Sequence, residues 1–133
     1  MTSASRYLSE RIALPADAVY EFTSAPENLP RWAAGLATTV SKQGDRWVIG
    51  DDGAELIFTP RNDFGILDHW VRPPDGAEVY SPMRVIPDGD DAAEVMFTLR
   101  RLPGITDDEF ERDADLVQAD LTRLREVLES AQR

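Results

Sequence analysis

The feature that most constrains the fold is a long amphipathic segment close to the C-terminus. It begins with Thr106-Asp107-Asp108-Glu109, a capping box in which the threonine hydroxyl satisfies a free backbone amide and Glu109 reaches back. Apolar residues then recur every three or four positions and form one stripe: Phe110, Ala114, Val117, Leu121, Leu124 and Leu128. We therefore predict a helix of about 24 residues and about 36 Å, whose apolar side must pack across another layer.

The middle of the chain has the pattern of strands joined by tight turns. Glycine and aspartate gather at short intervals, and they supply the positive φ angles and local hydrogen bonds of hairpin turns. Because the connections are short, neighbouring strands must be antiparallel. Six strands are predicted in this part of the chain: Leu36–Lys42, Arg46–Gly50, Ala54–Arg61, Phe64–Arg72, Ala77–Ile86 and Ala92–Leu102.

Ahead of these strands, the pattern predicts one further strand and two short helices. The strand covers Ser5–Leu14, and Pro15 ends it. A first helix covers Ala16–Phe22. A second helix starts at Ser24, with the serine as its cap and a proline near the first turn, and it ends close to Trp32.

This order of elements predicts an α+β domain that spans residues 1–133. A curved antiparallel sheet of about seven strands wraps on the long C-terminal helix, with the two short helices following the first strand. Gly65 and Pro82 interrupt predicted strands and are therefore expected at bends or bulges. A strongly bent sheet with one helix across its open side leaves a gap, and we expect an apolar pocket there.

The composition disfavours several classes of function. The chain has no cysteine, which excludes disulfides, thiolate metal sites and a cysteine nucleophile. Its net charge of −11, with arginines scattered along the chain, disfavours nucleic acid and anionic membranes as partners. The N-terminus lacks the apolar run of a signal peptide and no stretch is long enough to insert into a bilayer, so we expect a cytoplasmic protein.

The sequence carries no motif typical of a cofactor or metal site. It contains neither a dinucleotide fingerprint nor a phosphate-binding loop, and we expect no cofactor. The aspartates at 88, 90 and 91 lack the spacing and the closing glutamate of a calcium loop, so they are interpreted as a solvated turn. No metal site is predicted.

Two stretches near the N-terminus resemble a known superfamily. Ile12–Phe22, followed by Pro26–Trp32, looks like the opening signature of the SRPBCC superfamily, which includes START-like lipid-transfer domains, plant pollen allergens and polyketide cyclases. The stretches Phe64–Trp70 and Pro82–Val85 are similar to small bacterial members described as polyketide cyclase-like. The resemblance implies the helix-grip fold over nearly the whole chain. It carries over no catalytic residue, because the superfamily shares no catalytic motif.

Asp68 and His69 are the candidate catalytic residues. His69 is the only histidine, and its ordinary pKa near 6.5 suits proton transfer at neutral pH. Adjacent residues of a strand point to opposite faces, so only one of the two lines the pocket. If Phe64, Ile66 and Trp70 face inward, Asp68 faces inward as well and His69 faces solvent. Asp68 is then a carboxylate with a raised pKa, or it forms a structural ion pair with Arg84.

The residues expected to line the pocket are mainly large and apolar. Aromatic and methionine side chains provide broad, adaptable contact with an apolar ligand, although the same residues would also fill an ordinary core. The predicted ligand-binding residues are Trp32, Trp47, Phe58, Asp68, Trp70, Tyr80, Met83, Arg84, Phe97, Val117 and Leu121.

Three functional hypotheses remain open from the sequence. In the first, the pocket binds a small apolar or amphipathic molecule and no bond is made or broken. In the second, the chain is a polyketide cyclase or dehydratase in which Asp68 or His69 moves protons while Tyr80 and Arg84 hold carbonyl oxygens. In the third, the pocket is filled by its own side chains and the domain docks another protein. Exposed edge strands also leave a homodimer open.

Overall fold

The computed structural model describes residues 4–33, 39–50 and 53–131. The long helix at the end and the short helices after the first strand agree with the prediction. Residues 36–38 of the strand predicted over Leu36–Lys42 lie outside the described residues. The elements are, in order, β1 (Ser5–Ile12), α1 (Ala16–Thr23), the 3₁₀ turn η1 (Pro26–Asn28), α2 (Leu29–Trp32), β2 (Val40–Gln43), β3 (Arg46–Ile49), β4 (Ala54–Phe58), β5 (His69–Arg72), β6 (Val79–Ser81), β7 (Met83–Pro87), β8 (Ala93–Arg100) and α3 (Asp107–Ser130).

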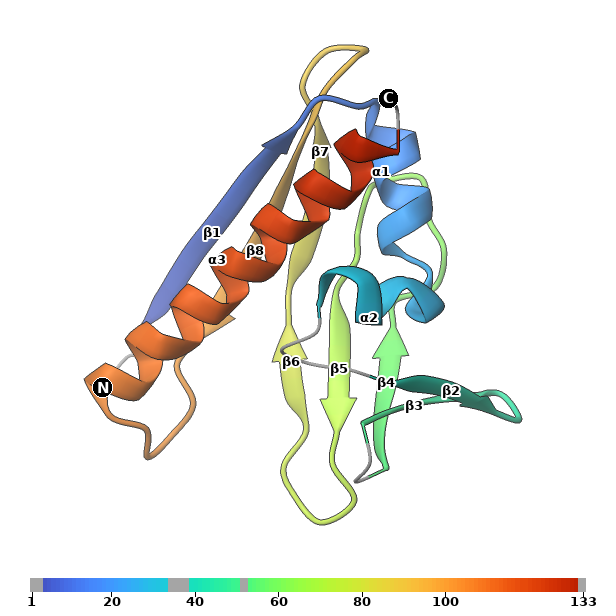
Figure 1. The fold of residues 1–133 in the computed structure, drawn as a ribbon. Helices are drawn as coiled ribbons and strands as arrows, with labels where there is room; N and C mark the ends of the chain where they lie inside the picture. Colours follow the sequence, from blue (N-terminus) through green and yellow to red (C-terminus); the bar gives the residue numbers. More distant parts are fainter. Residues whose placement is uncertain (1–3, 34–38, 51–52, 132–133) are drawn as a thin grey trace.

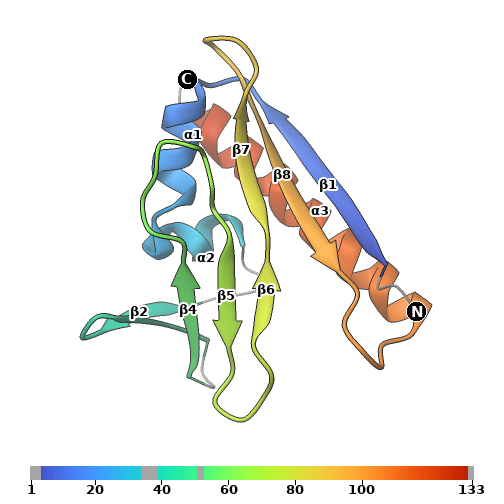
Figure 2. The same ribbon diagram turned by 180° about the vertical axis from the view of Figure 1, so that it is seen from behind.

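The strands form two antiparallel sheets, where the sequence predicted one sheet of about seven strands. The strand order is β1-β8-β7 in the first sheet and β2-β3-β4-β5-β6 in the second. Figure 1 and Figure 2 show that α1, α2 and α3 all lie on the same face of the strand layer, which we call the inner face. The α+β class and the long helix on a curved sheet are therefore confirmed. The strand count for the described residues is corrected to eight.

The division between the two sheets falls at Pro82. The strand predicted over Ala77–Ile86 splits there into β6 and β7, because proline has no backbone N–H and cannot continue the ladder. The Pro82 carbonyl oxygen still accepts a hydrogen bond from the Thr98 amide at 3.0 Å. As a result β6 stays beside β5, whereas β7 pairs with β8.

The stretch before β5 also departs from the prediction. The predicted strand Phe64–Arg72 pairs regularly only from His69 onward, and its first half follows β7 irregularly. Gly65 has a φ of 72°, and a Cβ there would lie 2.2 Å from the carbonyl oxygen of Val85. Only glycine permits this approach. The Gly65 carbonyl oxygen accepts from the Val85 amide at 2.8 Å, so this contact links the two sheets.

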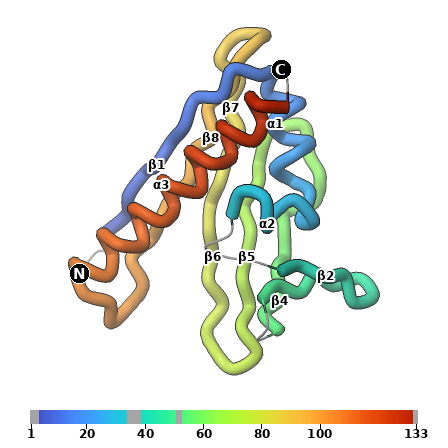
Figure 3. The backbone as a smooth tube through the Cα atoms, in the orientation of Figure 1, coloured from blue at the N-terminus to red at the C-terminus, as the bar shows by residue number. Residues whose placement is uncertain are grey.

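Helix α3 begins with the predicted capping box and runs for 24 residues. The Glu109 amide donates to the Thr106 hydroxyl at 3.1 Å, and the Thr106 amide donates to the Glu109 carboxylate at 2.9 Å. Figure 3 shows α3 running along β1, against which it packs. The predicted apolar stripe of α3 faces the strands. Its buried members are Phe110, Ala114, Leu121, Leu124 and Leu128, and Val117 is half-buried.

One polar contact is enclosed between β1 and α3. The Glu10 carboxylate, whose side chain is 14% exposed, accepts hydrogen bonds from Gln118 at 3.1 Å and from Thr122 at 3.3 Å. It also forms an ion pair with Arg125. Because a buried carboxylate is costly unless it is paired, these contacts favour one register of the helix on the strand.

The two short helices, α1 and α2, also lie on the inner face. Helix α1 agrees closely with the helix predicted over Ala16–Phe22. Ser24, however, does not cap the second predicted helix. The Ser24 hydroxyl donates to the Glu21 carbonyl oxygen at 3.4 Å, and η1 precedes α2. Leu29 and Trp32 of α2 are both buried, and α2 packs against α3. None of the described helices combines the length and the apolar character that a membrane crossing requires.

Candidate functional site

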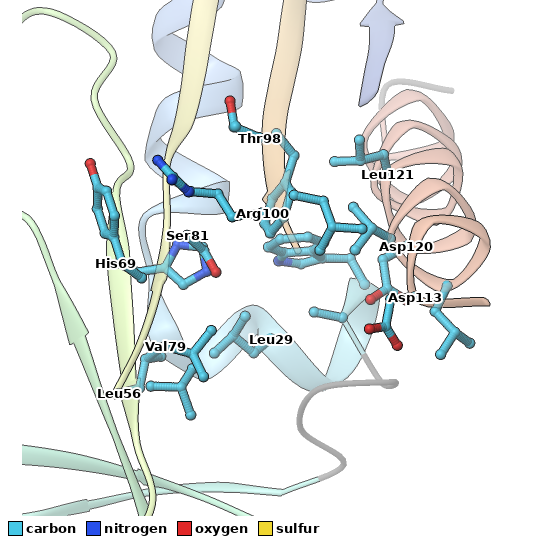
Figure 4. Close-up of a pocket in the computed structure, with 18 of the residues that line it drawn as sticks. Leu29, Leu56, His69, Val79, Ser81, Thr98, Arg100, Asp113, Asp120 and Leu121 are labelled. Carbon is cyan, nitrogen blue, oxygen red and sulfur yellow. The ribbon is translucent and has the colours of Figure 1, made fainter. Parts of the chain in front are cut away.

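A cavity of about 310 Å³ lies between the inner face of the strands and helices α2 and α3 (Figure 4). Its strand walls come from β4, β5 and β6 on one side and β8 on the other, so it lies where the two sheets separate. Most of its surface is hydrocarbon. The apolar lining residues are Leu29, Trp32, Ala33, Leu56, Phe58, Val71, Val79, Phe97, Leu99, Leu102, Leu116, Val117 and Leu121.

The strand register decides which side chains enter the cavity. Phe58, His69 and Ser81 are cross-strand neighbours on β4, β5 and β6, and all three line it. The next register position belongs to Trp70 and Tyr80, whose rings stack on each other with centroids 5.2 Å apart. Because side chains alternate between the two faces of a strand, the stacked pair lies on the outer face.

His69 lies on the cavity wall and not in solvent. Only 6% of it is exposed, and its ring lies between those of Phe58 and Phe97, with centroid distances of 5.2 and 6.0 Å. The expectation that Asp68 faces inward and His69 outward is therefore wrong. The expectation extended the alternation of a strand back to Phe64, but that side chain is 80% exposed and the regular strand begins only at His69.

The His69 ring has a defined tautomer. Its Nδ1 lies 3.0 Å from the carbonyl oxygen of Leu67, which can only accept, so Nδ1 carries the proton and Nε2 carries a lone pair. Burial lowers the pKa of His69, and this effect outweighs the Leu67 hydrogen bond and the nearby Asp68 charge, which raise it. The ring is therefore neutral at pH 7, with Nε2 as an acceptor.

Asp68 is held on the opposite side of the chain, at the junction between the sheets. One carboxylate oxygen accepts from the Met83 amide at 2.8 Å and lies 3.6 Å from Arg84 Nε, so the predicted pairing with Arg84 is present. The other oxygen accepts from the Tyr80 hydroxyl at 2.8 Å. This hydrogen bond is the main reason that the pKa of Tyr80 is raised. These contacts give Asp68 a structural role beside Pro82, where the strand ladder is interrupted.

The structure places the predicted ligand-binding residues in three groups. Five of them line the cavity: Trp32, Phe58, Phe97, Val117 and Leu121. Tyr80 borders it, although its ring packs on the outer face. Five do not line it: Trp47, Asp68, Trp70, Met83 and Arg84.

The residues outside the cavity have identifiable positions. Met83 is 1% exposed and belongs to the core. Trp47 is on β3, beside a separate polar hollow next to η1, with the Lys42 ammonium 5.7 Å from its ring centroid. Trp70 and Arg84 occupy outward positions of β5 and β7. Side-chain size alone could not separate these places, because the large residues serve both faces and the core.

Four polar lining residues were not predicted: Thr98, Arg100, Asp113 and Asp120. The sequence did hold a signal for some of them. Asp113 and Asp120 lie four positions before and three after Val117, so helical spacing puts them beside the apolar stripe. Within the described residues, no group of three or more carboxylate or imidazole side chains converges to hold a metal ion.

Two buried polar atoms have no hydrogen-bond partner in the part of the chain that the structure describes. They are the Thr23 hydroxyl oxygen and the Trp32 indole Nε1, and Trp32 lines the cavity. Buried donors are nearly always paired in folded proteins, so an unpaired indole N–H beside a hollow is notable. The site therefore combines broad apolar walls with few polar atoms, among them the His69 Nε2 acceptor.

No family model matches the sequence, and no curated protein matches it. Solved structures do resemble the fold. A START superfamily protein from Mycobacterium smegmatis has a TM-score of 0.66 at 12% identity, over 98% of this chain and 99% of that chain. The ZhuI aromatase/cyclase from Streptomyces sp. R1128 has a TM-score of 0.67 at 14% identity, over 99% and 97%.

A third similar structure is norcoclaurine synthase from Thalictrum flavum in complex with dopamine and hydroxybenzaldehyde. It has a TM-score of 0.55 at 16% identity, over 96% of this chain and 88% of that chain. Together the three comparisons show that the chain has the START-like, SRPBCC-type fold that its N-terminal stretches resemble. At these identities the likeness concerns the fold alone.

Proposed function

We propose that the chain binds a small, largely apolar molecule in the cavity between α3 and the strands. The observation that carries the proposal is the unfilled, hydrocarbon-lined hollow of about 310 Å³. This volume is at the lower end of the roughly 300–1,000 Å³ typical of small-molecule sites, and such sites are mostly apolar with a few oriented polar groups. A compact organic molecule of one to three rings fits that size.

The hollow favours this function over the two alternatives. A domain whose pocket is filled by its own side chains has no reason to leave Phe58, Phe97 and Leu121 around open space, since buried apolar groups are normally close-packed. A cyclase of the kind outlined from the sequence needs several polar groups inside the pocket. Asp68 and Arg84 lie outside it, which leaves His69 on the wall and Tyr80 at the border.

The structural neighbours support a ligand-binding role at the level of the fold. One is described as an aromatase/cyclase, and another was solved with dopamine and hydroxybenzaldehyde. Both descriptions concern small organic molecules. Carried to this chain, they support a pocket for an aromatic or similarly compact compound.

Filling the cavity tests the proposal. Val117 faces the cavity from α3, whereas Ala119, two residues further along, is exposed and does not line it. We expect the neutral fluorescent probe N-phenyl-1-naphthylamine to bind the unmodified chain saturably, Val117→Trp to weaken binding about tenfold or more, and Ala119→Trp to leave it unchanged.

Circular dichroism and thermal melting check that both variants fold. If Val117→Trp fails to fold, Val71→Trp fills the same space from the opposite wall. Probe binding that does not saturate, or that two folded cavity-filling variants leave unchanged, contradicts the proposal.

A further inference from the structure

His69 places a lone hydrogen-bond acceptor on the cavity wall. Its Nδ1 proton is engaged by the Leu67 carbonyl oxygen, so Nε2 is the free nitrogen of a neutral ring. Nε2 has no hydrogen-bond partner among the described residues. It is also absent from the atoms that are both buried and unpaired, which are those of Thr23 and Trp32. The nitrogen is therefore accessible from the cavity that the ring lines.

A further polar group lies on the same cavity surface. Ser81 is the direct cross-strand neighbour of His69, and its hydroxyl has no partner in the described chain (Figure 4). Paired side chains on one face of antiparallel strands have Cβ atoms about 5 Å apart, so His69 and Ser81 can contact one ligand group together.

From this arrangement we propose that the cavity holds its ligand with a neutral hydroxyl group pointing inward, the hydroxyl donating to His69 Nε2 and lying beside Ser81, while the ligand's apolar body fills the hydrocarbon walls. This inference rests on the proposed function and adds the chemical class and the orientation of the ligand. The class is a compact, uncharged molecule with an O–H at its buried end.

The same atoms disfavour an anionic ligand end at that position. A neutral imidazole with its proton on Nδ1 offers only a lone pair at Nε2, which repels a carboxylate oxygen. Burial lowers the pKa of His69, so the ring does not supply a compensating positive charge at neutral pH. At the α3 side, the carboxylates of Asp113 and Asp120 also border the cavity, and Arg100 of β8 is another charged lining residue. A fatty acid entering carboxylate-first would therefore be a poor fit.

A matched series of naphthalenes tests the inference by isothermal titration calorimetry at pH 7.5. Naphthalene, 2-methoxynaphthalene, 2-naphthol and 2-naphthoate share one apolar body and differ in the polar group. We expect 2-naphthol to bind about tenfold more tightly than 2-methoxynaphthalene, because only the naphthol donates a hydrogen bond, and 2-naphthoate to bind most weakly. In His69→Phe the ratio of the affinity for 2-naphthol to that for 2-methoxynaphthalene should fall to about one.

The outcomes separate the two proposals. Equal affinity for 2-naphthol and 2-methoxynaphthalene overturns this inference and leaves apolar binding intact, whereas no binding of any neutral member overturns both. A second readout does not need a variant. His69 is the only histidine in the chain, so its two ring ¹⁵N resonances are unambiguous. We expect 2-naphthol to shift the unprotonated Nε2 signal and to leave the protonated Nδ1 signal nearly unchanged; a free protein protonated at Nε2 overturns the inference.

Discussion

Asp68 and His69 are adjacent in the chain, but their side chains lie on opposite sides of it and have different roles. The Asp68 carboxylate accepts the Met83 amide beside Pro82, where the ladder between strands is interrupted. The His69 ring turns inward and forms part of the cavity wall. A buried polar group lowers stability unless it is paired, and each of the two is paired differently, Asp68 through both oxygens and His69 through Nδ1 alone. The free Nε2 of His69 is the atom to which our further inference assigns the ligand's hydroxyl group.

The burial of His69 predicts how stability depends on pH. Its pKa in the folded chain is below the ordinary value of 6.5, so between these two values the unfolded chain binds more protons. Stability therefore rises with pH in that window, and it falls on acidification from pH 6.5 toward the folded pKa, by at most about 1.4 kcal/mol per pH unit. We expect urea midpoints to decrease from pH 7.5 to pH 5.5, where most carboxylates are still ionised, and His69→Phe to lose this decrease. An equal decrease in both proteins would contradict the assignment.

At the scale of elements, the parts predicted well were those determined by local sequence. The capping box of Thr106 and the apolar stripe of α3 depend on contacts within a few residues, and the structure has both. The division into two sheets was not predicted, because it depends on which neighbours Pro82 and Gly65 meet. Strand alternation was then counted through an irregular stretch, which turned Asp68 inward and His69 outward. Because β5 begins only at His69, the strand alternation has to be counted from that residue, and this count turns the His69 side chain inward.

Gly65 offers a test of this junction. In Gly65→Ala the new Cβ would lie 2.2 Å from the Val85 carbonyl oxygen, in addition to the strain of a φ of 72°. Gly89 is a matched control, because it has a φ of 74° and a Cβ added there would meet no atom within 4 Å. We expect Gly89→Ala to lose about 1–2 kcal/mol from the left-handed backbone alone. Gly65→Ala should lose about 1–3 kcal/mol more, from the clash. Denaturant unfolding of both variants measures this difference, and equal losses would show that the close approach does not occur.

At the scale of the whole molecule, the cavity lies between two walls whose strands belong to different sheets. One wall is the sheet β1-β8-β7 with α3 packed on β1, and the other contains β4, β5 and β6. The chain passes from one to the other at Pro82, and hydrogen bonds of Gly65 with Val85, and of Leu67 and Asp68 with Met83, also join them. A molecule in the cavity touches Leu121 and Phe97 on one side and Phe58 on the other, so it adds contacts across the gap between the sheets.

Because a bound molecule contacts both walls, we expect it to slow amide hydrogen exchange in both of them. A ligand that binds only the folded state stabilises it by RT ln(1 + [L]/Kd), or about 2.7 kcal/mol at a hundredfold excess over Kd. With N-phenyl-1-naphthylamine at that excess, we expect amide hydrogen exchange to slow both in β4–β6 and in the part of α3 around Val117. The β2–β3 hairpin serves as an internal control, since none of its residues lines the cavity and most are exposed, so its fast-exchanging amides should change least. Val117→Trp should lose the protection on both walls together, while Ala119→Trp keeps it. Protection confined to α3 would mean that the probe binds to the outside of the helix, because only a molecule seated between the sheets can stabilise both walls at once.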